Sequence, residues 1–315
     1  MTVAPRPQVH KLAALTGHRD CVYALSGHSA DATFYSAGAD GLVVAWNVDA
    51  PAQDGQLVAR VENSVYALHY EAARQLLVIG HNYQGVQVID LRDKTLRHAT
   101  ALPPLAIFDF AYSEPRQRLY VALGDGTLAV LRTTDFSVEQ LVRVADKSLR
   151  CLSLHEGRGE LAVGSSDHRL RVLDADSLQV KHTLTEASNS VFTCAFSPDG
   201  RRLYAAGRDA HLRAYDADHD YAEALTVVAH LYAINHLCFS PDGRLLATGS
   251  MDKSIKLWDA ASGRLLRVVD RARHAGHGTS VNRLFWSGRQ NRLVSCSDDR
   301  SLAVWQISEE LGERS

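Results

Sequence analysis

The residue types of a hydrolytic triad recur along this chain at one fixed spacing. In the clearest copy, His230 is followed by Thr248 and Asp252. A histidine, a hydroxyl group and an aspartate are the parts from which many hydrolases build a nucleophile and its general base. The two further copies are His18, Ser36, Asp40 and His277, Ser295, Asp299. An enzyme needs one exposed nucleophile, so the recurrence of the set favours structural groups over a catalytic centre.

Two other clusters contain residues that metals prefer. His274 and His277 are three residues apart, but a structural zinc site usually has four ligands, and these supply at most two. The run of Asp216, Asp218 and Asp220 is similar to the start of a calcium loop. It lacks the glycine and the bidentate glutamate that such a loop requires. Glycine-rich phosphate-binding patterns are absent from the sequence. We therefore expect no metal site, no cofactor and no catalytic residue.

An aspartate followed six residues later by a large apolar residue marks a repeated unit. The clearest copy runs from Asp252 to Trp258, and the copy that ends at Ile89 has lost its aspartate. The apolar anchors of the seven copies are Trp46, Ile89, Leu131, Leu173, Tyr215, Trp258 and Trp305. Successive anchors are 42 or 43 residues apart, except for the last pair, which is 47 residues apart. A repeat of this length predicts a propeller or a solenoid.

Each unit reads as four short strands separated by turns. In the sixth unit the expected strands are Ile234–Phe239, Leu245–Thr248, Ile255–Trp258 and Leu265–Val269. The first two are separated by Ser-Pro-Asp-Gly, in which proline presets one backbone angle and glycine supplies a positive φ. Parallel pairing would need a dozen or more connecting residues at each step. Because a unit of about 42 residues has no room for these, we expect antiparallel sheets and exclude helical solenoids.

The sequence resembles the WD40-repeat β-propeller family over about residues 9–308. The resemblance rests on Gly17-His18, the Ser240–Gly243 turn and Trp258-Asp259. It implies an all-β fold, a seven-bladed β-propeller in which each blade is a four-stranded antiparallel sheet. It also implies that the N-terminal strand Val9–Leu15 completes blade seven and closes the ring, which removes an open sheet edge. Residues 1–8 and 309–315 are expected to be short tails.

The resemblance assigns the recurring triad-like sets to buried hydrogen-bonded networks that include a tryptophan. The expected networks are His18, Ser36, Asp40 and Trp46; His230, Thr248, Asp252 and Trp258; and His277, Ser295, Asp299 and Trp305. Buried polar groups of these kinds can satisfy one another. The histidine position is taken in blades two to five by Val61, Pro103, Ala145 and Ala187. We expect these four blades to rely on apolar packing and to be the softer half.

One position in each unit is expected to surround the channel mouth on the partner-binding face. It directly follows the first apolar residue of the innermost strand, and its occupants are Tyr23, Tyr66, Phe108, Arg150, Phe192, Asn235 and Asn282. By the same resemblance, Arg19, Arg208, Leu231, Met251 and Asp298 lie on this face. Exposed aromatic and arginine side chains dominate the energetics of protein interfaces. The competing interpretation is that the aromatic residues fill the space between blades.

Composition bounds the location of the protein. The 315 residues carry a net charge of −2, so they give no overall attraction to nucleic acid. The sequence contains no run of about 18 apolar residues, the length needed to cross a membrane. Its N-terminus also lacks the apolar segment of a secretory signal. Five cysteines without paired spacing argue against a disulfide framework. We expect a cytoplasmic protein.

These observations predict a non-catalytic scaffold that binds a protein or peptide on the face around the channel. One alternative is a propeller enzyme of the hydrolase or lactonase type with a channel-bound metal. Another is a subunit of a nucleic-acid-associated complex, since four arginines cluster at Arg264, Arg267, Arg271 and Arg273. A salt titration of DNA binding would test the second alternative. We expect a monomer or one subunit of a larger complex.

Overall fold

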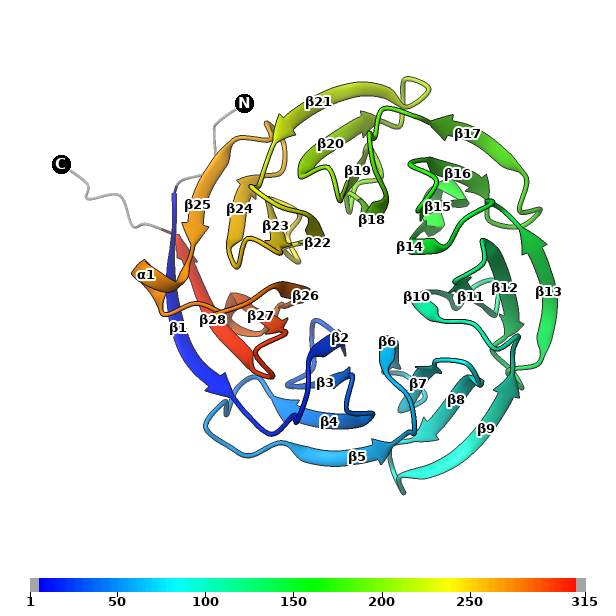
Figure 1. The fold of residues 1–315 in the computed structure, drawn as a ribbon, viewed down its shortest axis with the longest axis horizontal. Coiled ribbons are helices and arrows are strands. Elements are labelled where there is room, and N and C mark those ends of the chain that lie inside the picture. The colour runs from blue at the N-terminus through cyan, green and yellow to red at the C-terminus, as the bar shows by residue number, and fades with distance from the viewer. Residues whose placement is uncertain (1–5, 310–315) are drawn as a thin grey trace.

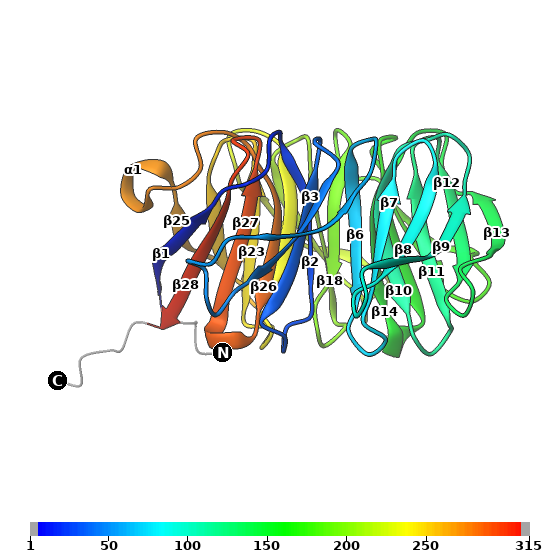
Figure 2. The ribbon, with the colours of Figure 1, turned by 90° about the horizontal axis from the view of Figure 1, so that it is seen from below.

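The computed structural model describes residues 6–309. Its strands form seven four-stranded antiparallel sheets arranged as the blades of a closed ring, which confirms the predicted fold (Figure 1). Seen from the side, the ring is a thick disc with loops on two faces (Figure 2). In six of the sheets the order along the chain is also the order in space, from the central opening outward; in the seventh, β26, β27 and β28 follow this order and β1 lies outermost.

The blades are numbered along the chain. Blade one comprises β2 (Val22–Gly27), β3 (Thr33–Gly38), β4 (Leu42–Asn47) and β5 (Gln56–Arg60). Blade two comprises β6 (Val65–Glu71), β7 (Leu76–His81), β8 (Gly85–Asp90) and β9 (Thr95–Ala101). Blade three comprises β10 (Ile107–Ser113), β11 (Arg118–Leu123), β12 (Thr127–Arg132) and β13 (Val138–Arg143). Blade four comprises β14 (Leu149–His155), β15 (Glu160–Ser165), β16 (Leu170–Asp174) and β17 (Val180–Leu184). Blade five comprises β18 (Val191–Phe196), β19 (Arg202–Gly207), β20 (His211–Asp216) and β21 (Ala222–Val228). Blade six comprises β22 (Ile234–Phe239), β23 (Leu245–Ser250), β24 (Ile255–Asp259) and β25 (Leu265–Val269). Blade seven comprises β26 (Val281–Ser287), β27 (Arg292–Ser297) and β28 (Leu302–Glu309), and β1 (Pro7–Leu15) is its outermost strand.

Ring closure is made by the first and last strands. β1 pairs antiparallel with β28, so that Val9 lies opposite Ile307 and Leu15 opposite Leu302. β1 begins at Pro7 and β28 ends at Glu309, slightly beyond the expected limits of 9 and 308. Residues 1–5 and 310–315 of the expected tails lie outside the described residues.

The last spacing of 47 residues has a local explanation. A one-turn helix, α1 (Arg271–His274), stands between β25 and β26, and the Asp270 side chain accepts from the Arg273 backbone N–H at its start. Two short 3-10 turns, η1 (Glu156–Arg158) and η2 (Arg289–Asn291), lie between the first and second strands of blades four and seven. These are the only helical segments among residues 6–309.

The apolar core is divided among the interfaces between blades. Each pair of neighbouring blades shares one cluster of buried side chains. Val78 and Val88 of blade two, for example, pack with Val121 and Leu123 of blade three. Because the second and third strands bury both faces, their residues are apolar in near-continuous runs, whereas the outermost strands are mostly exposed. Burial of this kind contributes about 1.5–3 kcal/mol for each large apolar side chain.

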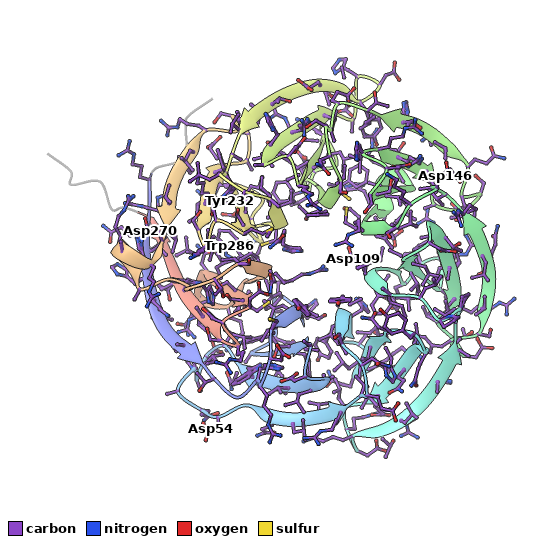
Figure 3. All side chains as sticks on the ribbon, in the orientation of Figure 1. Asp54, Asp109, Asp146, Tyr232, Asp270 and Trp286 are labelled. Atoms are coloured by element: carbon purple, nitrogen blue, oxygen red, sulfur yellow. The ribbon has the colours of Figure 1, made fainter. Side chains whose placement is uncertain are left out.

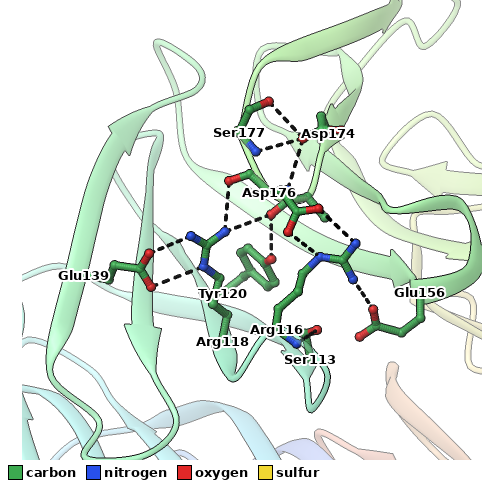
Figure 4. Close-up of polar contacts among 10 residues, drawn as sticks. Ser113, Arg116, Arg118, Tyr120, Glu139, Glu156, Asp174, Asp176 and Ser177 are labelled. Carbon is green, nitrogen blue, oxygen red and sulfur yellow. Dashed lines mark hydrogen bonds and ion pairs between the residues drawn. The ribbon is translucent and has the colours of Figure 1, made fainter.

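Side chains also join neighbouring blades on one face of the ring. Here an arginine or tyrosine donates to a backbone carbonyl two residues beyond the anchor of the next blade. Tyr120 Oη donates to the Ala175 carbonyl at 2.7 Å, and Arg118 also reaches this strand end (Figure 4). The other donor and acceptor pairs are Arg74 with Thr133, Arg158 with Ala217, Tyr204 with Ala260 and Arg292 with Val48. We call these contacts the carbonyl latches.

Candidate functional site

A β-bulge places one residue of each inner strand toward the central opening. In every blade the pairing register between the first and second strands shifts just after the first apolar residue of the inner strand. A bulge leaves an extra residue unpaired and redirects its side chain. The extra residues include the seven positions aligned in the sequence, namely Tyr23, Tyr66, Phe108, Arg150, Phe192, Asn235 and Asn282. A local backbone irregularity repeated seven times therefore sets these side chains in a ring.

These seven side chains line one cavity of about 520 Å³, which we call the channel mouth. It opens on the face where the chain enters each inner strand, the entry face. All seven residues are half-buried. The aromatic rings of neighbouring residues among them also contact one another. The ring centroids of Tyr23 and Tyr66 are 5.0 Å apart, and those of Tyr66 and Phe108 are 5.7 Å apart. The aromatic residues therefore both pack on one another and face the cavity.

Arg150 is sandwiched between two of these rings. Its guanidinium carbon lies 4.0 Å from the ring centroid of Phe108 and 4.9 Å from that of Phe192. Burial lowers the pKa of Arg150 below its ordinary value, although the side chain remains charged near neutral pH. Among the described residues, no carboxylate forms an ion pair with Arg150. Cation–π contacts of this kind offset only part of the loss of hydration.

Arg283, which also lines the channel mouth, belongs to a charge pair that crosses the ring. Arg283 of blade seven donates to Asp109 of blade three at 2.7 Å. Asp109 lies beside the central opening and also accepts from the Leu152 backbone N–H (Figure 3). The two residues are 174 positions apart in sequence. Unlike Arg150, the other arginine of this cavity therefore has its own counter-ion.

A second cavity of about 470 Å³ adjoins the channel mouth through Phe192, and we call it the side pocket. Besides Phe192, three of the residues expected on the entry face line it: Arg208, Leu231 and Met251. Leu231 is 85% exposed, and its neighbour Tyr232 is 64% exposed. The side pocket therefore presents large apolar side chains to solvent.

The other expected residues lie at the margins of these cavities. Arg19 is exposed, and its backbone N–H donates to Asp40. Asp298 accepts from Asn282 Nδ2 at 2.7 Å. Neither Arg19 nor Asp298 lines the channel mouth or the side pocket.

Sequence reasoning missed Tyr83, Arg283 and Tyr232. Tyr83 lines the channel mouth, is 59% exposed and stands six residues before Ile89, where the other units carry aspartate. The break in the repeat at this position was the signal that could have found it. Tyr232 directly follows Leu231, which was expected on this face, but nothing in the sequence indicated that Tyr232 would also be exposed.

The triad-like sets form closed hydrogen-bonded networks. In blade six, His230 Nδ1 lies 2.8 Å from Asp252, and His230 Nε2 lies 2.8 Å from Thr248 Oγ1. Trp258 Nε1 donates to the same hydroxyl oxygen at 2.9 Å. Since burial lowers the pKa of His230, the imidazole is neutral, with Nδ1 donating to Asp252 and Nε2 accepting from Thr248. The hydroxyl is therefore committed to the network.

Blades one and seven repeat this arrangement. His18 Nε2 lies 2.7 Å from Ser36 Oγ, which accepts from Trp46 Nε1 at 2.7 Å. His277 Nε2 lies 2.8 Å from Ser295 Oγ in the same way, and the remaining members of the two networks are Asp40, Asp299 and Trp305. Ser36, Thr248 and Ser295 are all fully buried, so none is placed as an exposed nucleophile.

The expectation that blades two to five rely on apolar packing is wrong for blades four and five. Arg171 Nη2 lies 2.6 Å from Asp167, and Arg171 Nη1 lies 3.0 Å from Ser165 Oγ. Arg213 pairs with Asp209 at 2.8 Å in blade five. An arginine on the third strand thus reaches the turn aspartate that histidine binds elsewhere. The alignment showed the missing histidine but not this replacement from another strand.

The metal and basic clusters noted in the sequence have ordinary contacts. Among residues 6–309, no three His, Cys, Asp or Glu side chains are grouped as a metal site would require. His219 pairs with Asp216 at 3.0 Å. Arg267 donates to the Pro7 carbonyl, and Arg273 pairs with Asp270. No helix within the described part of the chain has the length and hydropathy to cross a membrane.

A family model described as "WD domain, G-beta repeat" matches residues 9–47, 178–216, 223–259 and 269–306. These matches include the units that carry the histidine networks. The chain is a WD40-repeat protein. Blades two, three and most of blade four lie outside the matched segments, but they complete the same WD40 ring.

Three curated proteins are similar to this WD40 chain over part of their length. A "Striatin homolog" of Dictyostelium discoideum is 21% identical over 68% of this chain and 30% of its own length. A "66 kDa stress protein" of Physarum polycephalum is 23% identical over 94% of this chain and 41% of its own. A "Diphthine methyltransferase" of Schizosaccharomyces pombe is 32% identical over 40% of this chain and 41% of its own. The chain thus spans less than half the length of each relative.

Proposed function

We propose that this protein is a non-catalytic scaffold that binds a peptide segment or protein loop at the channel mouth. The observation that carries this proposal is the convergence of seven bulge residues on one cavity. Four of them are aromatic and one is arginine, the residue types that most often anchor protein interfaces. The family supports the same class of function, because WD40 propellers generally mediate protein interactions.

The side pocket supports the proposal from a second direction. Leu231, Tyr232 and Met251 are exposed next to the channel mouth. Contiguous exposed apolar side chains on a soluble protein commonly mark an interaction surface. A partner that fills the channel mouth would also cover this pocket.

The test is capture of partners by the purified protein and by the double variant Tyr66→Ala/Arg150→Ala. We expect the specifically captured proteins to be lost with the variant, since it removes two central anchors of the mouth. The matched control is Leu57→Ala/Arg201→Ala, which changes exposed residues away from both cavities. Unchanged capture by a Tyr66/Arg150 variant of unchanged melting temperature would rule out the channel mouth as the binding site.

A second candidate function is an enzymatic one, favoured by the similarity to the diphthine methyltransferase. That similarity covers 135 residues. The direct test is to incubate the protein with a diphthine-containing substrate and a methyl donor, and to follow methylation by mass spectrometry. Turnover that survives Tyr66→Ala/Arg150→Ala would place the chemistry away from the channel mouth and support this candidate.

We also propose a cytoplasmic location and action as a monomer or as one subunit of a complex. All five cysteines are free thiols, including Cys151 and Cys194, whose sulfur atoms lie 3.5 Å apart across two blades. Free thiols in close pairs are typical of a reducing compartment. Fractionation of cells and light scattering of the purified protein would test these two assignments.

A further inference from the structure

We propose that the channel mouth and side pocket together select an acidic peptide segment of a partner protein. A carboxylate of the peptide lies against Arg150, and a large apolar side chain a few residues away enters the side pocket. This inference rests on the proposed function and adds the chemistry of the partner to it.

The first argument is the unbalanced charge of Arg150. Its guanidinium is partly buried between Phe108 and Phe192, yet no described carboxylate pairs with it. Arg283 lines the same cavity and is neutralised by Asp109 at 2.7 Å. Removing a charge from water is unfavourable unless a counter-charge is supplied. A carboxylate arriving through the channel mouth would supply it and form charge-assisted hydrogen bonds.

The second argument is the apolar surface beside this charge. Leu231 is 85% exposed, Tyr232 64% and Met251 48%, and all three line the side pocket. Phe192 borders both this pocket and the channel mouth, and it also stacks on Arg150. A ligand that spans the two cavities therefore needs its acidic and apolar groups close together in sequence. An extended peptide, which rises about 3.3 Å per residue, can place both within a few residues.

The third argument is the charge around the two cavities. Arg208 at the edge of the side pocket is exposed and has no ion-pair partner among the described residues. Across the entry face, Asp298 and Asp20 carry the opposite charge. A short acidic peptide can remain on the Arg150 and Arg208 side. A nucleic-acid strand would bring its phosphates near the aspartates, so a peptide fits this surface better.

The experiment uses two pools of fluorescein-labelled, C-terminally amidated ten-residue peptides. In the acidic pool, glutamate is fixed and leucine, phenylalanine or methionine follows two to four residues later. In the control pool, glutamine replaces glutamate, and all other positions are uncharged in both pools. Fluorescence anisotropy with the full chain should show about 10-fold tighter binding of the acidic pool, the size expected of one charge-assisted contact.

Variants of the protein separate the two parts of the site. Arg150→Gln should abolish the preference for the acidic pool, while Arg201→Gln, an exposed arginine away from both cavities, should retain it. Leu231→Ser should weaken both pools about 5-fold through loss of apolar contact. Leu57→Ser is its control, because Leu57 is 53% exposed on an outer strand. Melting temperatures establish that each variant is folded.

Equal affinity for the two pools, an acidic preference that persists in Arg150→Gln, or no binding of the acidic pool at millimolar protein would overturn the inference. The proposed function is judged separately by partner capture. If capture depends on Tyr66 and Arg150 but the pools are not distinguished, the channel mouth binds partners of other chemistry. If capture is also independent of these residues, both proposals fail.

Discussion

At the residue scale, the same turn aspartate binds a histidine in some blades and an arginine in others. In blade six, Asp252 accepts from a neutral histidine, and the network continues to an indole N–H. In blade four, Asp167 instead forms an ion pair with Arg171, which is 7% exposed. A buried ion pair leaves an uncompensated charge when one partner is removed. The two networks hold the same turn but respond differently to mutation.

The replacement of Asp167 by alanine should therefore be costly. We expect Asp167→Ala to lower the free energy of unfolding by about 3 kcal/mol, because it strands a buried guanidinium. Asp125→Ala is the matched control, since Asp125 occupies the same turn position and its partner Arg143 is 54% exposed on its side chain. It should lose only about 1 kcal/mol. Urea denaturation measures both, and equal losses would show that the ion pair is not what stabilises blade four.

At the element scale, the carbonyl latches tie the ends of five third strands to a neighbouring blade. The Ala260 carbonyl accepts from Tyr204 alone among the described donors, at 2.7 Å. The Ala175 carbonyl accepts from Tyr120 at 2.7 Å and lies 3.4 Å from Arg118 Nη1. Tyr120 and Tyr204 are both fully buried. Two latches of the same geometry thus differ in whether a second donor is present.

This difference predicts unequal effects of removing the two tyrosine hydroxyls. We expect Tyr204→Phe to lower the free energy of unfolding by about 2 kcal/mol, because the Ala260 carbonyl is left unpaired. Tyr120→Phe should cost under about 1 kcal/mol, since Arg118 remains to donate. Chemical denaturation of the two variants is the measurement. A larger loss for Tyr120→Phe would contradict this explanation of the latches.

At the scale of the whole molecule, stability depends on the pairing of β1 with β28. Val9 and Leu15 point into the clusters that blade seven shares with its neighbours, and they are 7% and 3% exposed. Leu12 lies on the same strand but is 43% exposed. β1 therefore contributes buried side chains as well as the hydrogen bonds that remove an open edge.

Substitutions along β1 should report directly on closure of the ring. We expect Leu15→Asp to lower the free energy of unfolding by about 3 kcal/mol or more, because it places a carboxylate in an apolar interface. Leu12→Asp should change it by less than about 1 kcal/mol. Thermal and urea unfolding are the measurements. If the two variants unfold alike, β1 does not close the ring in solution.

Much of the fold was determined by the sequence alone. The recurrence of the anchors from Trp46 to Trp305 predicted seven units, and turn residues such as Ser240–Gly243 predicted four strands in each. These signals are local, because strand period and turn chemistry act over a few neighbouring residues. Aligning the units also identified seven of the residues that line the channel mouth, since each occupies the same place in its strand.

The tertiary structure alone decided how those residues interact. The stacking of Arg150 on Phe108 and Phe192, and the pairing of Asp109 with Arg283 across 174 positions, appear only when the ring closes. The exchange of histidine for Arg171 in blade four likewise depends on two strands meeting at one turn. The physical reason is that charge and packing depend on distance in space, whereas the repeat specifies only distance along the chain.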